Sequence, residues 1–532
     1  MFFKVRTVEI SGRSRQTDVC YNRAMGRFFN TEGPVRPDEN YCLPPLGRLD
    51  LGQVLDLIDR KRYFILHAPR QTGKTSCLLA LTEHLNREGR YRCLYVNLEV
   101  AQTAREDVGR GVKAILSVLG TRARQYLGDG YPESIAQSAP REAGEDAALG
   151  HVLTLWAERS RSPLVILFDE IDSLIGDTLV SVLRQLREGY EKRPTNFPQS
   201  VVLCGVRDVK DYRIYSSREK TQITGGSAFN IKAESLRLGD FTRDDVHTLY
   251  KQHTEETGQA FEGNALEFAW DLTRGQPWLV NALAYRACFK MKAGRDRSKP
   301  ITAGMILDAK EQLIIERVTH LDQLADKLSE LRVRRVIEPM LGGGTFSKAP
   351  SDDDIRYVTD LGLILRGTEG LQVANPIYRE VIPRQLSDLA QAEFETTHDV
   401  AWYLRSDGTL DMPKLLGAFQ EFFRESSEIW LERFAYKEAG PQLLMQAFLQ
   451  RIVNGGGYIQ REYGLGLGRT DLMLIWPHAG GRQKVAIELK LVRKSVERTI
   501  AEGLAQTSAY MDRCGAEDEG HLVIFDRRRG RS

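Results

Sequence analysis

The feature that most constrains the fold is the stretch 63–81, where a short apolar run, a polar turn and a helical pattern follow one another. The apolar run Tyr63–Leu66 predicts a buried strand, and the pattern Cys77–Leu81 predicts a helix. The turn between them ends in Gly73-Lys74-Thr75. A strand, a turn, Gly-Lys-Thr and a helix form the sequence context of a phosphate-binding P-loop.

This turn is suited to hold the phosphates of a nucleotide. Its backbone N–H groups point at an anion, and the helix N-terminus adds a partial positive charge. Lys74 would reach the β- and γ-phosphates, and the Thr75 hydroxyl would ligate Mg²⁺. Ala68 stands where the pattern has its first glycine, and alanine can make the turn if its φ is negative. The alternative is a helix-capping turn with a chance Gly-Lys-Thr. The expected nucleotide-binding residues of the turn are Ala68, Pro69, Arg70, Gln71, Thr72, Gly73, Lys74, Thr75 and Ser76.

A second motif is the apolar run Leu164–Phe168, which ends in Asp169 and Glu170. It predicts a strand buried on both faces that delivers two carboxylates at its C-terminal end. Asp169 would hold Mg²⁺ through water, and Glu170 would polarise the attacking water. The two motifs together resemble the additional-strand catalytic-Glu ATPases of the AAA+/STAND group. The resemblance implies ATP and Mg²⁺ as cofactors and a homo-oligomer that forms on ATP binding.

Three further residues are singled out by the same resemblance. Tyr41, in a Pro-rich and Gly-rich N-terminal arm, is a candidate for stacking on the base, or else it fills a surface groove. Arg207 follows another apolar run and would sense the γ-phosphate, or else it is a surface arginine paired with Asp208. Pro277 lies in a Gly-x-Pro turn of the kind that packs on the base in the lid of such ATPases, or else it marks an ordinary break between helices.

Helices followed by a short hairpin over residues 296–390 suggest a winged helix. A winged helix can bind DNA, yet the tip Thr368-Glu369-Gly370 lacks basic residues and the last helix contains Asp352-Asp353-Asp354. We therefore expect an intramolecular lid here rather than a DNA reader.

A second chemical centre is expected after residue 431. Two strands of a predicted hairpin place Asp471 and Glu488 near each other, and Glu488 and Lys490 share a face because they are two apart on a strand. Two carboxylates and a main-chain carbonyl make an oxygen-rich site suited to Mg²⁺ or Mn²⁺. Lys490 would orient the attacking water or steady the charge on a phosphate.

This Asp…Glu-x-Lys arrangement resembles the PD-(D/E)XK nuclease superfamily. Gln506 and Tyr510, on one face of the following helix, match the Gln-x-x-x-Tyr element of its RecB-like branch. The resemblance implies that both support the active site and touch DNA. Related nucleases often carry Glu or His on the first helix, where this chain has Gln442 and Gln446, with Glu438 at the helix start. A one-metal or handicapped site is one expectation, and a surface hairpin with solvated charges is the alternative.

Composition limits the other classes of function. The chain has 532 residues, which is too long for one core and typical of about two to four domains. The net charge is +2, so a nucleic-acid site must be a local patch. The seven cysteines form no C-x-x-C pair, which disfavours a zinc site or a disulfide framework. The chain has no run of ~18 apolar residues, and its opening residues lead into polar sequence. We therefore expect no membrane partner and a cytoplasmic location.

The sequence therefore predicts an α/β multidomain protein in which an ATPase, through ATP, regulates a metal-dependent nucleic-acid hydrolase on the same chain. DNA is the expected substrate. By family analogy, bacterial defence or mobile-element biology fits. The alternatives are a STAND-like signalling ATPase whose nuclease-like domain only binds DNA or protein, and a translocating motor. The expected units are an N-terminal arm at 1–50, a parallel-sheet P-loop ATPase core at 51–235, a helical lid at 236–295, a winged helix at 296–390, a helical connector at 391–430 and a C-terminal α/β PD-(D/E)XK nuclease-like domain at 431–532.

Overall fold

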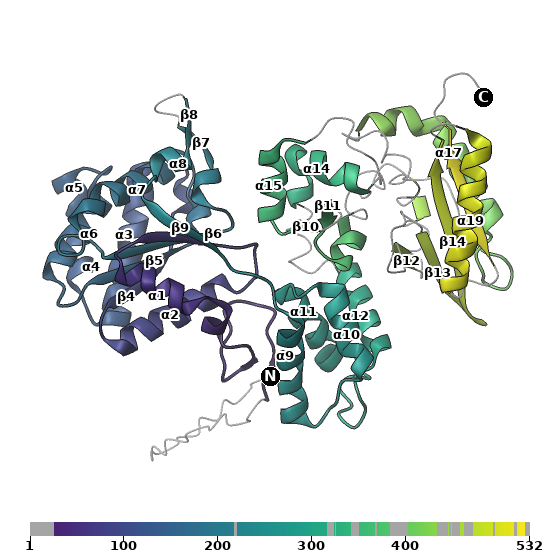
Figure 1. Ribbon diagram of the computed structural model, residues 1–532, viewed down its shortest axis with the longest axis horizontal. Helices are drawn as coiled ribbons and strands as arrows, with labels where there is room; N and C mark the ends of the chain where they lie inside the picture. The colour runs from purple at the N-terminus through teal and green to yellow at the C-terminus, as the bar shows by residue number, and fades with distance from the viewer. Residues whose placement is uncertain are drawn as a thin grey trace, which may run out of the picture.

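The protein is described here from a computed structural model (Figure 1). The described residues are 26–216, 221–316, 324, 326–341, 350–367, 370–382, 403–433, 445, 448–449, 458–461, 472–492, 495–514 and 519–526. Figure 1 shows a helix-covered sheet at one end of the molecule, a group of lid helices in the middle and a second sheet at the other end. No helix in these ranges is long and apolar enough to cross a membrane.

The first sheet is fully parallel and has the strand order β4-β5-β6-β3-β9. The strand before the P-loop, β3, and the strand that ends at Asp169, β5, are therefore separated by one further strand. This order confirms the expected parallel sheet and its additional strand. The carboxyl ends of parallel strands meet at one edge, so the P-loop, Asp169 and Arg207, which follow or end three of these strands, lie there. The strands are β3 (Tyr63–His67), β4 (Arg92–Asn97), β5 (Leu164–Asp169), β6 (Ser200–Gly205) and β9 (Lys232–Arg237).

Helices cover both faces of this sheet, which explains why its central strands are continuous apolar runs. One face packs against α1 and α2, and the other packs against α3, α6 and α7. Two short helices, α4 and α5, continue from α3, and Trp156 of α6 donates its indole N–H to Asp129 before α4. These helices are α1 (Leu51–Asp59), α2 (Lys74–Glu88), α3 (Val108–Leu127), α4 (Tyr131–Ala136), α5 (Ala139–Ala143), α6 (Ala148–Arg159) and α7 (Gly176–Glu188).

The helices after the sheet are called the lid helices here; three lie in the range expected for the lid, 236–295, and the one at 303–315 lies in the range expected for the winged helix. Thr242 and Asp245 form a reciprocal capping box, which satisfies backbone N–H groups at the start of α9. The turn at Gly275 has a φ of 79°, and Pro277 is the first residue of α11, a position where its missing N–H costs nothing. The helices are α9 (Arg243–Thr257), α10 (Gly263–Thr273), α11 (Pro277–Tyr285) and α12 (Ala303–Ile315).

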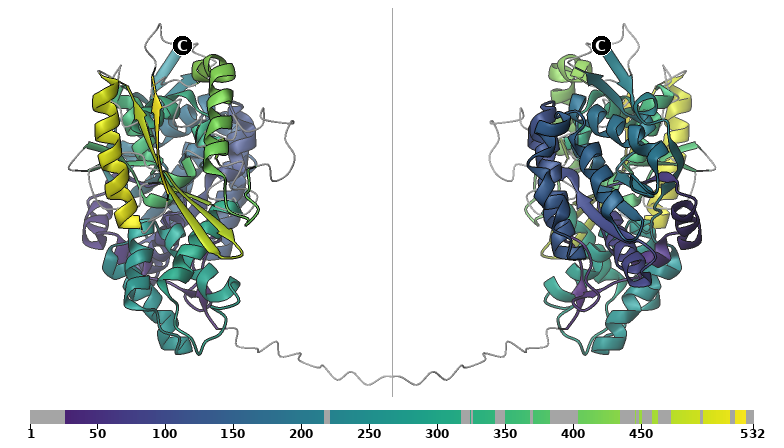
Figure 2. Two further views of the ribbon diagram at one scale, coloured as in Figure 1. Left: turned by 90° about the vertical axis from the view of Figure 1, so that its right-hand side faces the viewer. Right: turned by 90° about the vertical axis from the view of Figure 1, so that its left-hand side faces the viewer.

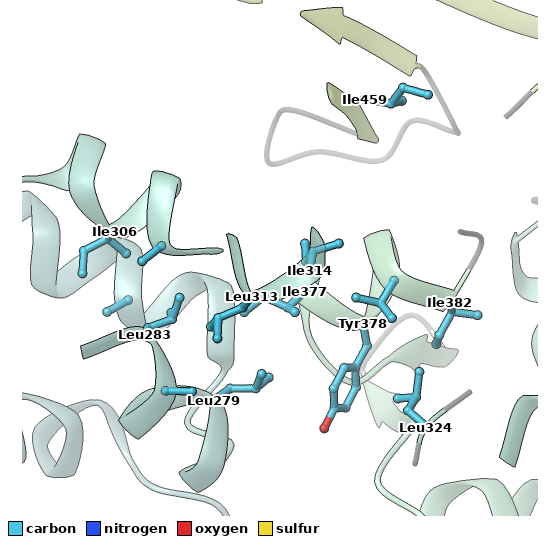
Figure 3. Packing of buried hydrophobic residues seen from close by; sticks show 14 of the residues in the cluster. Leu279, Leu283, Ile306, Leu313, Ile314, Leu324, Ile377, Tyr378, Ile382 and Ile459 are labelled. Atoms are coloured by element: carbon cyan, nitrogen blue, oxygen red, sulfur yellow. The ribbon is translucent and has the colours of Figure 1, made fainter. Parts of the chain in front are cut away.

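Two helices and a hairpin come next, in the order expected from the sequence. Their apolar core is continuous with that of the lid, because Leu279 and Leu283 of α11 belong to the same cluster as Ile377 and Tyr378 (Figure 3). The lid and this helix–hairpin unit, 331–382, therefore pack as one body. Its elements are α14 (Leu331–Leu341), α15 (Asp352–Asp360), β10 (Ile364–Gly367) and β11 (Gly370–Val373).

The C-terminal sheet has the order β12-β13-β14-β15, with β15 parallel to β14 and the other pairs antiparallel. A parallel pair needs a crossover, which α19 supplies. In Figure 2 (left), α19 and α17 stand on either side of the strands, and Phe419 and Phe423 of α17 lie 6.2 and 5.3 Å, ring to ring, from Phe525. The described part of the expected connector thus packs on this sheet. The elements are α17 (Met412–Arg433), β12 (Tyr458–Arg461), β13 (Leu472–His478), β14 (Gly481–Leu491), α19 (Val496–Cys514) and β15 (Gly520–Phe525).

Candidate nucleotide site

The P-loop folds over its own lysine. Lys74 is buried, and its Nζ donates to the carbonyl oxygens of Ala68 and Pro69 at 3.0 and 2.9 Å. Gln71 and Gly73 have positive φ values of 56° and 90°, and they make the sharp turn into α2. Ala68 is not among the described residues with positive φ, so alanine at the first position meets the condition set by the sequence. The loop carbonyls accept the hydrogen bonds of Lys74 that the phosphates of a bound nucleotide would accept in their place.

The two predicted magnesium residues are in contact. The Thr75 hydroxyl donates to Asp169 Oδ2 at 2.7 Å, and Asp169 is fully buried. Tyr95, at the end of the neighbouring strand, donates its hydroxyl to the same oxygen at 3.0 Å. A hydroxyl and a carboxylate at this distance suit a hard cation such as Mg²⁺. The sequence predicted Thr75 and Asp169, whereas the only signal for Tyr95 was its place near the end of a short apolar run.

Glu170 has a left-handed backbone, with φ 56° and ψ 44°. This conformation is unfavourable for a residue with a side chain, and such residues gather at functional sites. Burial raises the pKa of the Glu170 carboxyl, and the charges of Asp172 and Asp169 raise it further, while Lys74 and Arg70 act in the opposite direction. A carboxylate with a raised pKa beside the predicted phosphate and metal residues is suited to general-base work.

Arg207 is buried. The alternative interpretation, a surface arginine paired with Asp208, therefore does not describe it. Its Nε lies 3.3 Å from Oδ2 of Asp360, at the end of α15, and its guanidinium lies 4.8 Å from the centre of the Tyr357 ring. Asp208 pairs instead with Lys232 of β9. The γ-phosphate sensor role of Arg207 stays a prediction.

A pocket opens beside the P-loop. The N-terminal arm forms one wall through Tyr41 and Arg48, and α11 forms another through Pro277. Tyr41 is fully buried, with its ring 4.9 Å from that of Phe29, and its base-stacking role stays a prediction. Arg48 donates to the Thr72 carbonyl in the P-loop and, at 2.6 Å, to the carbonyl of residue 239 before the lid. Sequence reasoning missed Arg48, which no local motif marks. The pocket lining is Asn30, Thr31, Glu32, Gly33, Val35, Tyr41, Cys42, Leu43, Pro45, Arg48, Gln71, Gly73, Ser76, Cys77, Phe241, Leu249, Pro277, Trp278 and Asn281.

The predicted second centre is described only in part. Glu488 of β14 is buried and forms an ion pair with Lys490, which confirms that the two side chains share a face. Burial raises the pKa of the Glu488 carboxyl, and Lys490 opposes that shift. Glu488 Oε2 is buried with no hydrogen-bond partner among the described residues, an arrangement that suits a cation ligand. Gln506 lies exposed on α19.

Several predicted residues of that centre lie outside the described ones. They are Asp471, Gln442, Gln446, Glu438 and the side chain of Tyr510. Leu472, which follows Asp471 in the chain, pairs with Ile487, which precedes Glu488. Within the described ranges, no three His, Cys, Asp or Glu side chains are grouped so that they could hold a metal ion.

Comparison with known proteins gives one family match and several structural likenesses. Residues 58–212 match the model of the AAA domain. No curated protein sequence matches the chain. The Walker-type ATPase of Pyrococcus abyssi is 13% identical, with a TM-score of 0.44, over 66% of this chain and 99% of its own.

Two further solved structures are similarly distant in sequence. The RuvB Holliday junction branch migration motor of Thermotoga maritima is 14% identical, with a TM-score of 0.33, over 65% of this chain and 94% of its own. Cdc6p of Pyrobaculum aerophilum is 11% identical, with a TM-score of 0.34, over 76% of this chain and 93% of its own. The domain match at 58–212, together with the site geometry, supports an AAA-type P-loop ATPase that binds ATP.

Proposed function

We propose that this chain is a regulatory ATPase that binds and hydrolyses ATP and controls a metal-dependent nucleic-acid phosphodiester hydrolase acting on DNA. The observation that carries the hydrolase half is the buried Glu488 Oε2, which has no hydrogen-bond partner among the described residues and lies beside Lys490. A buried ionised oxygen without a partner is costly unless a cation or a proton satisfies it.

At the ATPase site, each residue has a task that follows from its contacts. Lys74 would exchange the carbonyls of Ala68 and Pro69 for phosphate oxygens. Thr75 and Asp169, 2.7 Å apart, would hold Mg²⁺, which neutralises phosphate charge when bound. Glu170 would take the proton of the attacking water, because its raised pKa makes its carboxylate a stronger base.

At the second site, the proposal places Asp471 opposite Glu488. The strand register supports this, since Leu472 pairs with Ile487. Asp471 and Glu488 would hold Mg²⁺ or Mn²⁺, a Lewis acid that activates water when bound. Lys490 would then leave Glu488 and face the scissile phosphate, with Gln506 and Tyr510 of α19 contacting DNA.

The nucleotide state would reach the second site through the helix–hairpin unit, a winged-helix module acting as an intramolecular lid. Its helix α15 contacts the ATPase core at Arg207, the predicted γ-phosphate sensor. ATP binding would also assemble a homo-oligomer. A role in bacterial defence or mobile-element biology remains part of this proposal by family analogy alone.

The test is incubation of the full chain with plasmid, linear and single-stranded DNA, with and without ATP, in Mg²⁺ or Mn²⁺. We expect cleavage that requires the metal and changes with the nucleotide. Glu488→Gln should abolish cleavage while ATP binding persists. Glu502→Gln, an exposed carboxylate of α19 paired with Arg498, is the matched control and should cut normally. If the wild type cuts nothing in any nucleotide state, the hydrolase half is wrong.

A second candidate function is a STAND-like signalling or assembly ATPase whose nuclease-like domain binds DNA or a protein partner without cutting. The Glu488–Lys490 ion pair favours it, because Lys490 already neutralises the carboxylate that a metal would need. DNA binding that is retained in Glu488→Gln, with no cleavage by the wild type, would support this second function.

A further inference from the structure

The buried aspartate of the ATPase site is held through both of its carboxylate oxygens. Asp169 Oδ1 accepts the backbone N–H of Glu170 at 2.9 Å. Its Oδ2 accepts the Thr75 hydroxyl at 2.7 Å and the Tyr95 hydroxyl at 3.0 Å. Thr75 is itself a predicted metal ligand, so its hydroxyl oxygen would be shared with a cation. Tyr95 has no such second task, and its contact with Asp169 therefore needs an explanation of its own.

The strand register explains how Tyr95 reaches this carboxylate. Strands β4 and β5 are parallel, and Asn97 lies opposite Asp169, so Tyr95 starts two residues farther back along its strand. Two residues of a strand rise about 6.6 Å, and residues two apart share a face of the sheet. A phenol ring with its hydroxyl covers that rise, whereas a serine or threonine hydroxyl at position 95 would stop short of the carboxylate.

The ring of Tyr95 is fixed by its surroundings. Tyr95 is buried in the same apolar cluster as Leu167 of β5 and Leu78 of α2. The Arg122 guanidinium of α3 lies 5.5 Å from the centre of the ring. A tyrosine has two side-chain torsions, so a ring packed in this way holds its hydroxyl in one place. The terminal torsion of an aspartate is broad by comparison, and the hydroxyl therefore restrains the carboxylate of Asp169.

We propose that Tyr95 is a positioning residue of the ATPase site, which fixes the plane of the Asp169 carboxylate and thereby sets the affinity for the Mg²⁺ that accompanies ATP. Groups that hydrogen-bond a metal-binding carboxylate orient it, and their loss typically weakens metal binding by about 10- to 100-fold. Tyr95 acts through Asp169 and not by touching the nucleotide. This inference rests on the proposed binding of ATP and Mg²⁺ at the P-loop, Thr75 and Asp169.

The test measures equilibrium binding of ATP to the full chain in excess Mg²⁺ and again in EDTA. The ratio of the two affinities is the contribution of the metal. Tyr95→Phe keeps the ring and removes only the hydroxyl, so we expect it to leave the affinity in EDTA unchanged and to lower the ratio about tenfold. A residue that only stabilises the fold would change both affinities by one common factor and leave the ratio intact.

Tyr91→Phe is the matched control. Tyr91 and Tyr95 are both 6% exposed, and the Tyr91 hydroxyl also donates to an aspartate, Asp59, but at the opposite end of β4. This variant should keep the wild-type ratio. Adding Tyr95→Phe to Asp169→Asn should lower the ratio no further than Asp169→Asn alone, because the two residues act in series. Tyr95→Met, which also lacks the hydroxyl, should show the same tenfold loss and replaces a Tyr95→Phe protein that does not fold.

The outcomes separate the two levels of the proposal. A Tyr95→Phe protein that is folded by its thermal unfolding midpoint and keeps the wild-type ratio would overturn the role of Tyr95 and leave ATP binding intact. A further fall of the ratio in the Asp169→Asn background would overturn it too, because the effect would not pass through Asp169. If the wild type binds ATP equally in Mg²⁺ and in EDTA, the inference and the metal site fail while the P-loop proposal stands. If it binds no ATP, the ATPase proposal fails and the inference fails with it.

Discussion

Arg207 at the end of β6 and Asp360 at the end of α15 form a buried ion pair between residues 153 apart in the sequence, with Nε and Oδ2 separated by 3.3 Å. Two further contacts surround it. Arg356 of α15 pairs with Asp211 at 3.4 Å, and the Arg237 guanidinium donates to the Thr359 carbonyl at 3.3 Å. The end of α15 is thus docked on the edge of the sheet where nucleotide is expected.

Removing the Asp360 carboxylate should loosen this contact. In Asp360→Asn, Arg207 loses its charged partner and becomes available to a phosphate, so we expect ATP turnover to rise several-fold and the helix–hairpin unit to become more sensitive to protease. Steady-state phosphate release and limited proteolysis measure the two effects. Asp352→Asn, at the exposed start of the same helix, is the control. Unchanged turnover and unchanged proteolysis in Asp360→Asn would show that the ion pair is only structural.

Lys74→Ala should weaken ATP binding by roughly 10- to 100-fold, because a buried charge-assisted contact to phosphate is lost. Equilibrium binding of a fluorescent ATP analogue checks this. Lys113→Ala, an exposed lysine of α3, should bind as the wild type does. Wild-type affinity in Lys74→Ala would mean that the loop is a helix cap and not a phosphate site.

Glu170→Gln should keep ATP binding and lower turnover by roughly 10²- to 10⁴-fold, since the amide cannot accept the proton of the attacking water. The substitution also removes repulsion from Asp169 and Asp172, so the affinity for ATP should not fall. Single-turnover hydrolysis and binding, measured on one preparation, separate the two quantities. Glu99→Gln, an exposed carboxylate after β4, should hydrolyse ATP normally.

The pH dependence of ATP hydrolysis should report the same carboxyl group. Burial and the nearby carboxylates raise the pKa of Glu170 above its ordinary value of 4.5. The base must be ionised to act, so kcat/KM should fall as the pH falls through this raised pKa of the free enzyme. A profile that stays flat down to pH 4.5, in a protein that remains folded, would exclude Glu170 as the base.

Glu488 makes the stability of the C-terminal sheet depend on pH and on metal. Its pKa is raised in the folded chain, so the stabilisation from the protonated form is complete below the unfolded pKa and is lost as the pH rises through the folded pKa. A cation should reverse that loss at neutral pH by binding the ionised form. We expect Mn²⁺ to raise the thermal unfolding midpoint of the wild type but not that of Glu488→Gln. An equal metal response in both proteins would contradict a cation at Glu488.

The parts of the site that sequence predicts are those set by neighbours in the chain. The P-loop lysine and Asp169 follow apolar runs, because a buried parallel strand must be apolar and must end at the ligand edge. Glu488 and Lys490 share a face because strands alternate. The Arg207–Asp360 pair and the Arg48 contacts were out of reach, since each depends on segments brought together only by the folded chain.

The order of helices and strands along the chain follows from the sequence pattern, whereas their packing does not. The helix–hairpin order at 331–382 and the strand pattern after residue 458 agree with the structure. The described residues of the expected connector pack on the C-terminal sheet through Phe419 and Phe423, a contact that the sequence did not predict. The sequence of an amphipathic helix shows that one face is apolar, but it does not show which surface covers that face.

One apolar core joins the lid, the helix–hairpin unit and the C-terminal sheet, from Leu279 of α11 to Ile459 of β12. Close-packed interiors transmit displacement instead of absorbing it. If the base of a bound nucleotide at Pro277 tilted α11, the displacement would therefore be transmitted through this core to the strands that carry Glu488. Among the described residues, the two proposed sites would then be linked through one packed core.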